Sequence, residues 1–248
     1  FLNLINKKKF IQYSLIIFLS LSFSNLLIDL FKKNIERKKS KIFYENLFKK
    51  FDNYKFDLRT QKQVVDDLKK ETNSEVYPVT HPKHNLKKLS NFFPLSGISN
   101  STIVFCNESG NFSTYKSDRY GFNNYDENYD NFNNRVILIG DSFAHGACVD
   151  QNSTLSAQLN KINIPAFSFA YGGNGPLLEL ATLIEYIDVK TEIVLWIYAE
   201  NDMFDLIDEK KSEVLMNYLK KENYNQNLIN RQNEIDSYWK KLLKDEFN

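Results

Sequence analysis

The segment Val136–Ser142, with the sequence Val-Ile-Leu-Ile-Gly-Asp-Ser, constrains the fold of this chain more than any other. Its four consecutive apolar residues have the length and the β-branched content of a strand buried on both faces, as in a parallel sheet. Gly140 allows a tight exit that leaves the hydroxyl of Ser142 at the carboxyl edge of that strand. Open α/β sheets bind their ligands at this edge. Ser142 is therefore a candidate nucleophile.

Two further strand-like runs follow and end in polar or glycine-rich turns. The run 166–170 leads into a Gly-Gly-Asn-Gly turn at 172–175, and the run 193–198 leads into Glu-Asn-Asp at 200–202. Pro176 stands where the first turn of an intervening helix begins, a position at which a missing N–H costs little. This alternation of strand and helix predicts a right-handed, parallel α/β sheet.

These three blocks resemble those of the SGNH (GDSL-type) hydrolase superfamily, which has Gly-Asp-Ser, then a glycine, then Asn-Asp. Gly173 follows Ser142 by 31 residues, and Asn201 follows Gly173 by 28. The resemblance implies that Ser142 is the nucleophile. It also implies that the backbone N–H groups of Ser142 and Gly173 and the side chain of Asn201 line an oxyanion hole. The implied fold is a three-layer, flavodoxin-like sheet of the SGNH type.

The neighbouring carboxylates have supporting roles in this interpretation. We expect Asp141 to hold the nucleophile turn by hydrogen bonds to the local backbone, and Asp202 to start a helix and orient Asn201. Simpler alternatives stay open for each site residue. Ser142 could be a polar residue at a strand end, Gly173 could serve turn geometry alone, and Asn201 could cap the following helix.

The general base of the family lies in a late Asp-x-x-His block, and no such block occurs in this sequence. Without an adjacent imidazole a serine is a weak nucleophile. His81 and His84 lie in a polar, Pro-containing loop, where we expect them to be surface residues. His145 follows Ser142 on the turn that opens a helix, and we expect it at the rim of the pocket, pointing away from the nucleophile.

The sequence begins at Phe1 and stops at Asn248, directly after a helix-like stretch, and only three strands of a five-stranded core can be located. We therefore expect an inactive fragment, whose remaining strands and catalytic Asp and His lie beyond Asn248. The amphipathic segments 215–221 and 228–243 would then have apolar faces that lack their partners.

The amino-terminal part divides into two regions. Residues 10–28 contain no charge and would form a helix of roughly 28 Å, close to the apolar thickness of a bilayer. This predicts an uncleaved transmembrane anchor at 1–31; a cleaved signal peptide and a buried soluble helix are the alternatives. We expect a helical stalk and loop at 32–99.

The remaining residues, 100–248, are predicted to form the partial SGNH-type α/β domain. Two short strands are expected first, at 102–106 and 111–115, joined by a turn. The segment 117–124, Ser-Asp-Arg-Tyr-Gly-Phe-Asn-Asn, resembles one that precedes Gly-Asp-Ser in bacterial, membrane-linked members of the family. We expect it to form an accessory face of the core.

Composition excludes several classes of function. The net charge of +1, from 32 basic and 31 acidic residues, gives no electrostatic footprint for nucleic acid. Cys106 and Cys148 are the only cysteines and have no companions at metal-ligand spacing, so a zinc site is excluded. They could form a disulfide in an exported domain or be two buried thiols. No metal and no cofactor is predicted.

The sequence thus predicts a serine ester hydrolase or O-acyltransferase of the SGNH type, acting on acetyl-type esters of carbohydrate. The resemblance implies a single-pass protein of the bacterial inner membrane, with its catalytic domain outside the cytoplasm. The alternative is a non-catalytic, membrane-anchored module that binds an acylated glycan in the same pocket. An Asp-x-x-His block downstream would favour the enzyme.

Overall fold

The structure is a computed structural model that describes residues 56–86 and 92–247 of the 248-residue chain. The predicted transmembrane anchor at 1–31 and the first part of the predicted stalk lie outside these residues. Among the residues described, no helix is both long enough and apolar enough to cross a membrane. The elements given below belong to one unit, Arg59–Asn248.

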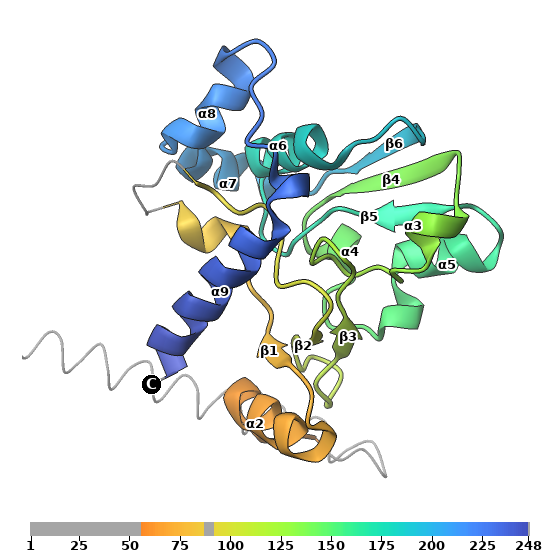
Figure 1. The fold of residues 1–248 in the computed structure, drawn as a ribbon, viewed down its shortest axis with the longest axis vertical. Helices are drawn as coiled ribbons and strands as arrows, with labels where there is room; N and C mark the ends of the chain where they lie inside the picture. Colours follow the sequence, from red (N-terminus) through yellow and green to blue (C-terminus); the bar gives the residue numbers. More distant parts are fainter. Residues whose placement is uncertain (1–55, 87–91, 248) are drawn as a thin grey trace, which may run out of the picture. The chain divides into compact units, whose positions relative to one another are not determined.

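The described residues form a mixed α/β fold with two three-stranded sheets (Figure 1). In the first sheet, β1 (Val76–Pro78) pairs in parallel with β2 (Thr102–Val104), and β2 pairs antiparallel with β3 (Thr114–Lys116). The second sheet is entirely parallel, in the order β5-β4-β6. Its strands are β4 (Arg135–Gly140), β5 (Ala166–Ser168) and β6 (Thr191–Ile197).

Helices connect and surround these strands. They are α2 (Gln61–Thr72), η1 (Pro82–Asn85), α3 (Asn128–Asn131), α4 (Ser142–His145), η2 (Gln151–Ser153), α5 (Leu155–Lys161), α6 (Pro176–Tyr186), α7 (Asp202–Glu209), α8 (Glu213–Lys220), η3 (Leu228–Asn230) and α9 (Gln232–Phe247). The predicted alternation of strand and helix after residue 135 is confirmed.

Strand β4 is the central strand of the parallel sheet, and all its residues are buried. Ile137 and Ile139 pack in the main core with the apolar residues of α6, whereas Val136 and Leu138 pack on the opposite side near Leu159 of α5. Helices therefore cover both faces of the sheet. Full burial of each such side chain contributes roughly 1.5–3 kcal/mol.

The last residue of β4 has to be a glycine because the backbone of β6 passes close to it. A Cβ atom at Gly140 would lie 2.7 Å from the carbonyl oxygen of Ile197 and 3.0 Å from Cβ of Ala144. The chain therefore turns sharply at Gly140 and begins α4 two residues later.

The two C-terminal helices are packed in the core, so the prediction that their apolar faces lack partners is wrong. Leu215 of α8 and Ile235 and Trp239 of α9 belong to the main core and are fully buried. The reason is the loop before β2, whose Phe93, Leu95 and Ile98 lie in the same cluster. Its backbone also accepts a hydrogen bond of 2.7 Å from Trp239 Nε1, at Ser96 O.

The unburied apolar surface lies instead on the edge strand β6 and on α7. Ile193, Leu195 and Trp196 of β6 are 43–49% exposed, and Phe204 of α7 is 72% exposed. The sequence of β6 reads as a strand buried on both faces, but the sheet of the described residues ends at this strand.

The hairpin prediction is confirmed, although β2 and β3 are shorter than expected. The segment 117–124 that follows is organised by Asp118, which is fully buried. Its carboxylate accepts hydrogen bonds from the backbone of Tyr120 and Phe122 at 2.9 Å and from the side chains of Asn124 and Tyr129 at 2.8 Å. Burial raises the pKa of Asp118 to about 6.

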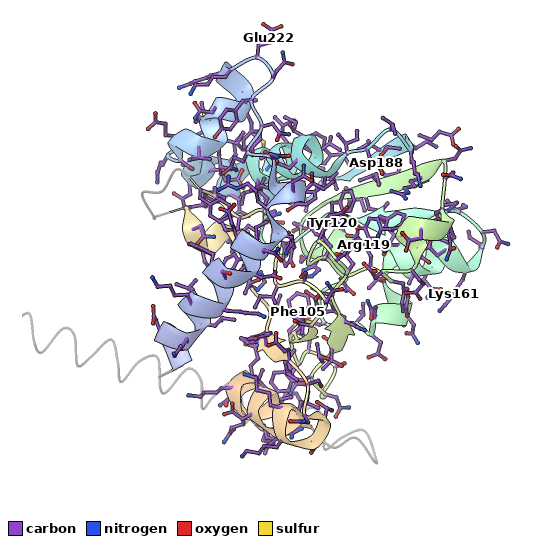
Figure 2. All side chains as sticks on the ribbon, in the orientation of Figure 1. Phe105, Arg119, Tyr120, Lys161, Asp188 and Glu222 are labelled. Atoms are coloured by element: carbon purple, nitrogen blue, oxygen red, sulfur yellow. A yellow bond between two sulfur atoms is a disulfide. The ribbon has the colours of Figure 1, made fainter. Side chains whose placement is uncertain are left out.

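This segment supports the strands that carry the site. Asn124 exchanges two hydrogen bonds with the backbone of Ser168 in β5, and Ser168 Oγ donates to Ala144 O in α4 at 2.6 Å. Arg119, Tyr120 and Asp188, which Figure 2 labels, are among the residues that line one small cavity.

Asparagine occupies six of the seven non-glycine positions with positive φ among the residues described. The non-glycine residues with positive φ are Asn73, Asn100, Asn134, Asn163, Asn223, Asn227 and Cys148 among the residues described. The short amide side chain tolerates this conformation better than other side chains do. The whole chain has only 8 glycines, so asparagine takes over turn positions that glycine would otherwise fill.

We expect Asp118→Ala to lower the free energy of unfolding by at least about 3 kcal/mol, because it leaves several buried donors without an acceptor. Urea denaturation followed by circular dichroism measures this change. Asp130→Ala is the control: its carboxylate binds Arg119 at the surface, where ion pairs contribute little. Equal losses in the two variants would contradict the role given to Asp118.

Candidate functional site

Ser142 lies at the predicted place, where β4 ends and the single turn of α4 begins. Asp141 caps this turn, because its Oδ1 accepts a hydrogen bond of 3.1 Å from Phe143 N. The prediction that Asp141 holds the turn through the local backbone is therefore confirmed. Ser142 is half-buried, and its Oγ donates to Asp141 Oδ2 at 3.4 Å. A bond of this length is weak, so the hydroxyl can exchange it for a ligand.

Asn201 reaches the same carboxylate from the end of β6. Its Nδ2 donates to Asp141 Oδ2 at 3.5 Å and to Asp202 Oδ1 at 3.4 Å. It stands at the N-cap of α7 but forms no capping hydrogen bond, so the interpretation of Asn201 as a helix cap is wrong. Asp202 starts α7 and accepts a bond of 2.7 Å from Ala199 N, which fixes the turn before the helix.

The turn after β5 brings the glycine block to Ser142. A Cβ atom placed on Gly172 would lie 3.7 Å from Ser142 Cβ. Gly173 has φ of +77° and is half-buried, with Lys83 Nζ against it. The N–H groups of Ser142 and Gly173 donate no hydrogen bond to any residue that the structure describes. Ser142, Gly173 and Asn201 thus lie at one edge of the sheet and present unused or weakly bonded donors.

His145 is fully buried, so its predicted place at the rim of the pocket is wrong. Its Nδ1 accepts a hydrogen bond of 3.2 Å from Gly172 N, and its Nε2 lies 3.3 Å from Tyr115 Oη. Because Nδ1 is an acceptor, the proton of the neutral ring is on Nε2. Burial lowers the pKa of His145 to about 3. Both ring nitrogens are occupied, so His145 is not available as a base for Ser142.

His81 is partly buried beside the site, so the expectation of a surface position is wrong for this residue, while His84 is exposed. The Nδ1 of His81 lies 2.9 Å from Gly172 O. Sequence reasoning missed this contact because it depends on the parallel pairing of β1 with β2, which carries the loop across the molecule. The only sequence feature that could have indicated the strand β1 was the short apolar and aromatic run at 76–79, just before the loop.

A buried glutamate holds the glycine-rich turn by hydrogen bonds to its backbone. Glu209 at the end of α7 accepts hydrogen bonds from Gly175 N at 2.7 Å and Leu177 N at 2.8 Å. These bonds use the free N–H groups at the start of α6 and hold the turn that contains Gly173. Sequence reasoning did not identify this residue.

Glu179 is a second buried carboxylate, and it accepts a bond of 2.6 Å from Trp196 Nε1. Burial, together with the nearby Asp202, Glu209 and Asp141, raises the pKa of Glu179 to about 8. Glu179 is therefore mostly protonated at neutral pH. Across the described part of the chain, no three His, Cys, Asp or Glu residues form a group that could hold a metal ion.

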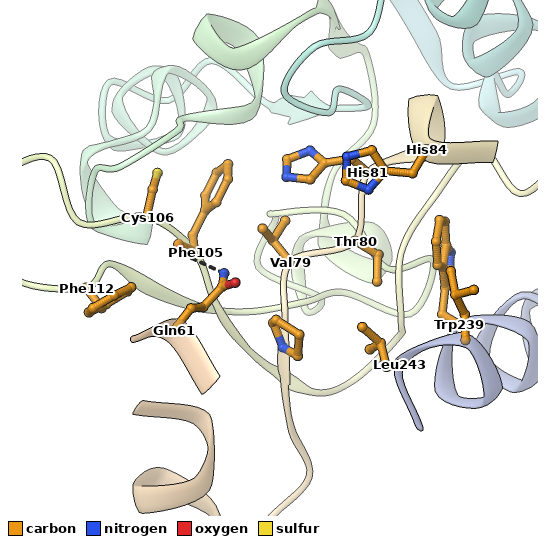
Figure 3. Close-up of a pocket in the computed structure, with 12 residues that line it drawn as sticks. Gln61, Val79, Thr80, His81, His84, Phe105, Cys106, Phe112, Trp239 and Leu243 are labelled. Carbon is orange, nitrogen blue, oxygen red and sulfur yellow. Dashed lines mark hydrogen bonds between the residues drawn. The ribbon is translucent and has the colours of Figure 1, made fainter. Parts of the chain in front are cut away.

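Two cavities adjoin the loop of His81. Figure 3 shows the first, of about 470 Å³, which is mainly apolar; His81 and His84 lie beside each other in its lining, and Trp239 and Leu243 of α9 also line it. The second, of about 480 Å³, is lined by Lys83 and Gly173 together with acidic residues of α7.

Cys106 and Cys148 form a disulfide, so the alternative of two buried thiols is wrong. The bond joins the end of β2 to the turn after α4 and closes a loop of 42 residues. It therefore ties the hairpin sheet to the turn that presents Ser142.

We expect replacement of both cysteines by serine to lower the free energy of unfolding by about 2–4 kcal/mol, because a loop of this length gains chain entropy when it is opened. Chemical denaturation with and without a reducing agent measures the change. The double variant should be insensitive to the reducing agent. An unchanged stability of the wild-type protein after reduction would contradict the prediction.

The chain matches no protein-family model, and searches of curated proteins and of solved structures also find no match. Functional assignment therefore depends on the geometry of the described residues.

Proposed function

We propose that the protein is a serine ester hydrolase or O-acyltransferase with an SGNH-type, flavodoxin-like core. One observation carries the proposal: the carboxyl ends of β4, β5 and β6 bring together a hydroxyl at Ser142, a glycine turn at Gly173 and a carboxamide at Asn201. The sheet order β5-β4-β6 puts the strand of the nucleophile between the two strands that supply the donors.

The arrangement suits acyl transfer. Ser142 Oγ would attack the ester carbonyl carbon, and the carbonyl oxygen would become an oxyanion. The N–H groups of Ser142 and Gly173 and Nδ2 of Asn201 would donate to this oxygen. Asn201 already forms only long bonds to carboxylates, so it loses little when it turns to a substrate. Water or a second alcohol then releases the acyl group.

The proposed substrates are acyl esters, of the acetyl type, on small molecules or carbohydrate. An exposed Asn201 and a half-buried Ser142 suit an alcohol that stays largely in solvent. The proposed location is the outer side of a bacterial inner membrane, with an N-terminal anchor. The Cys106–Cys148 disulfide supports a compartment outside the cytoplasm, because disulfides persist in oxidising environments.

A second candidate is a non-catalytic module that binds an acylated glycan in the same pocket. One observation favours it: the two imidazoles near Ser142, those of His81 and His145, bind the backbone of Gly172, whereas a Ser-His-Asp triad requires an imidazole bound to a carboxylate. Such a module would bind an acetylated sugar without releasing acetate. Binding measured by calorimetry, with no acetate formed on long incubation, would favour the module.

We expect Ser142→Ala to abolish hydrolysis of p-nitrophenyl acetate and of an acetylated sugar. Asn201→Ala should lower kcat by about 10²–10³ with little change in KM, because one oxyanion donor is lost. The double variant should be no worse than Ser142→Ala, since without the nucleophile no oxyanion forms.

Steady-state kinetics of the two single variants and the double variant give these values. Asn233→Ala, at an exposed position of α9, is the matched control and should keep the wild-type rate. A raised KM with unchanged kcat in Asn201→Ala would mean that Asn201 binds the ground state. Turnover that survives Ser142→Ala would refute the proposed function.

A further inference from the structure

His81 and Ser142 border the same small space above Gly172. A Cβ atom placed on Gly172 would have three nearest heavy atoms: Cε1 and Nδ1 of His81, at 3.5 and 3.7 Å, and Cβ of Ser142, at 3.7 Å. Because Gly172 has no side chain, a space about the size of a methyl group stays open between the imidazole of His81 and Ser142. We propose that His81 is the general base that activates Ser142, which replaces the expectation of an inactive fragment; this inference rests on the proposed function.

The protonation state of His81 suits a base. The carbonyl oxygen of Gly172 can only accept a hydrogen bond, so the His81 Nδ1 that lies 2.9 Å from it carries the proton. In the neutral ring the lone pair is then on Nε2. A backbone carbonyl thereby does the orienting that a carboxylate does in a Ser-His-Asp triad.

The charge around His81 keeps the ring neutral at physiological pH. Burial, together with the nearby His84 and Lys83 on η1, lowers its pKa to about 4. From α4, the neighbouring group is His145, whose own pKa is lowered in part by His81. The imidazole is thus unprotonated above about pH 5, the state in which a general base acts.

The backbone fixes the position of the ring. Val79 N donates to Val104 O at 2.9 Å and extends the pairing of β1 with β2 up to the loop. His84 N donates to His81 O at 3.0 Å and closes the turn of η1. The His81 ring lies 6.0 Å from the Phe105 ring and 5.3 Å from the His84 ring, centre to centre.

In the proposed reaction, Nε2 of His81 takes the proton of Ser142 Oγ as Oγ bonds to the ester carbonyl carbon. The carbonyl π electrons become the oxyanion lone pair. When the oxyanion collapses, the bond to the alcohol oxygen breaks, and that oxygen takes the proton from Nε2. A water then gives a proton to Nε2 and attacks the acyl-serine, and Ser142 leaves with that proton.

The first test separates the base from a structural role. We expect His81→Asn to lower kcat by about 10²–10⁴, the usual contribution of a general base. The asparagine amide can still donate to Gly172 O in place of Nδ1, but it offers no equivalent of Nε2. His84→Asn is the matched control and should keep the wild-type rate at pH 7. Circular dichroism and thermal unfolding check that each variant folds.

The pH profile of kcat/KM provides a readout that a structural role would not change. Because the base acts when it is unprotonated, the rate should be level from about pH 5 to 8 and fall as the pH drops through about 4. His84→Asn removes a positive charge, so it should raise the pKa of His81 and move the acid limb to higher pH. An acid limb that stays in place in this variant would count against His81.

A methyl group between the two side chains gives an independent test. In Gly172→Ala the new Cβ would be in ordinary contact with both residues, and φ of Gly172 is not in the left-handed region. We expect stability close to wild type and kcat at least about 10-fold lower, because the methyl group separates base from nucleophile. A wild-type rate in Gly172→Ala would overturn the proposal.

The outcomes distinguish the two proposals. If Ser142→Ala abolishes turnover and His81→Asn does not change it, His81 is not the base, and the proposed function stands. If Ser142→Ala retains turnover, the proposed function fails, whatever His81→Asn does. Recovery of activity in His81→Ala by added imidazole would directly support His81 as the base. A wild-type rate in His81→Ala, with no effect of imidazole, would exclude His81 as the base.

Discussion

The backbone of Gly172 makes the interactions on which the site depends, because its N–H and its carbonyl each bind a histidine. The N–H donates to His145, which follows β4, and the carbonyl accepts from His81, which follows β1. Buried backbone N–H and C=O groups must find partners within the protein. Here the partners come from both sheets, so satisfying the backbone of one residue also sets how the hairpin sheet and the parallel sheet meet. The Cys106–Cys148 disulfide reinforces the same junction.

The two imidazoles bound to the backbone of Gly172 are not equivalent, although both are neutral at physiological pH. His145 uses both nitrogens inside the protein and is closed to solvent, so it serves structure. His81 uses one nitrogen and lines a cavity, so the other nitrogen is free for chemistry. The difference follows from the direction of the hydrogen bond that each ring makes with Gly172. The N–H donor fixes one tautomer in His145, and the C=O acceptor fixes the other in His81.

Sequence patterns predicted the part of the fold that depends on local order. The run that ends in Ser142 is the central strand, and the spacing of Asn201 along the chain matches the end of the next parallel strand. The position of His81 could not be predicted, because a three-residue strand brings it to the site and such a strand carries almost no periodic signal. Trp239 was expected to lack a partner for the same reason: an irregular loop, not a strand, covers it.

The asparagines at left-handed turns have a consequence for how this sequence can diverge. A turn position that requires positive φ usually restricts the residue to glycine, since glycine alone fits without strain. Six asparagines meet that requirement here, at the ends of helices and in the turns between elements. Nucleotide composition can therefore drift towards adenine and thymine, exchanging glycine codons for asparagine codons at the surface, while the path of the backbone stays the same. The glycine that remains at 140 marks where a side chain is forbidden, because the backbone of β6 passes too close to it.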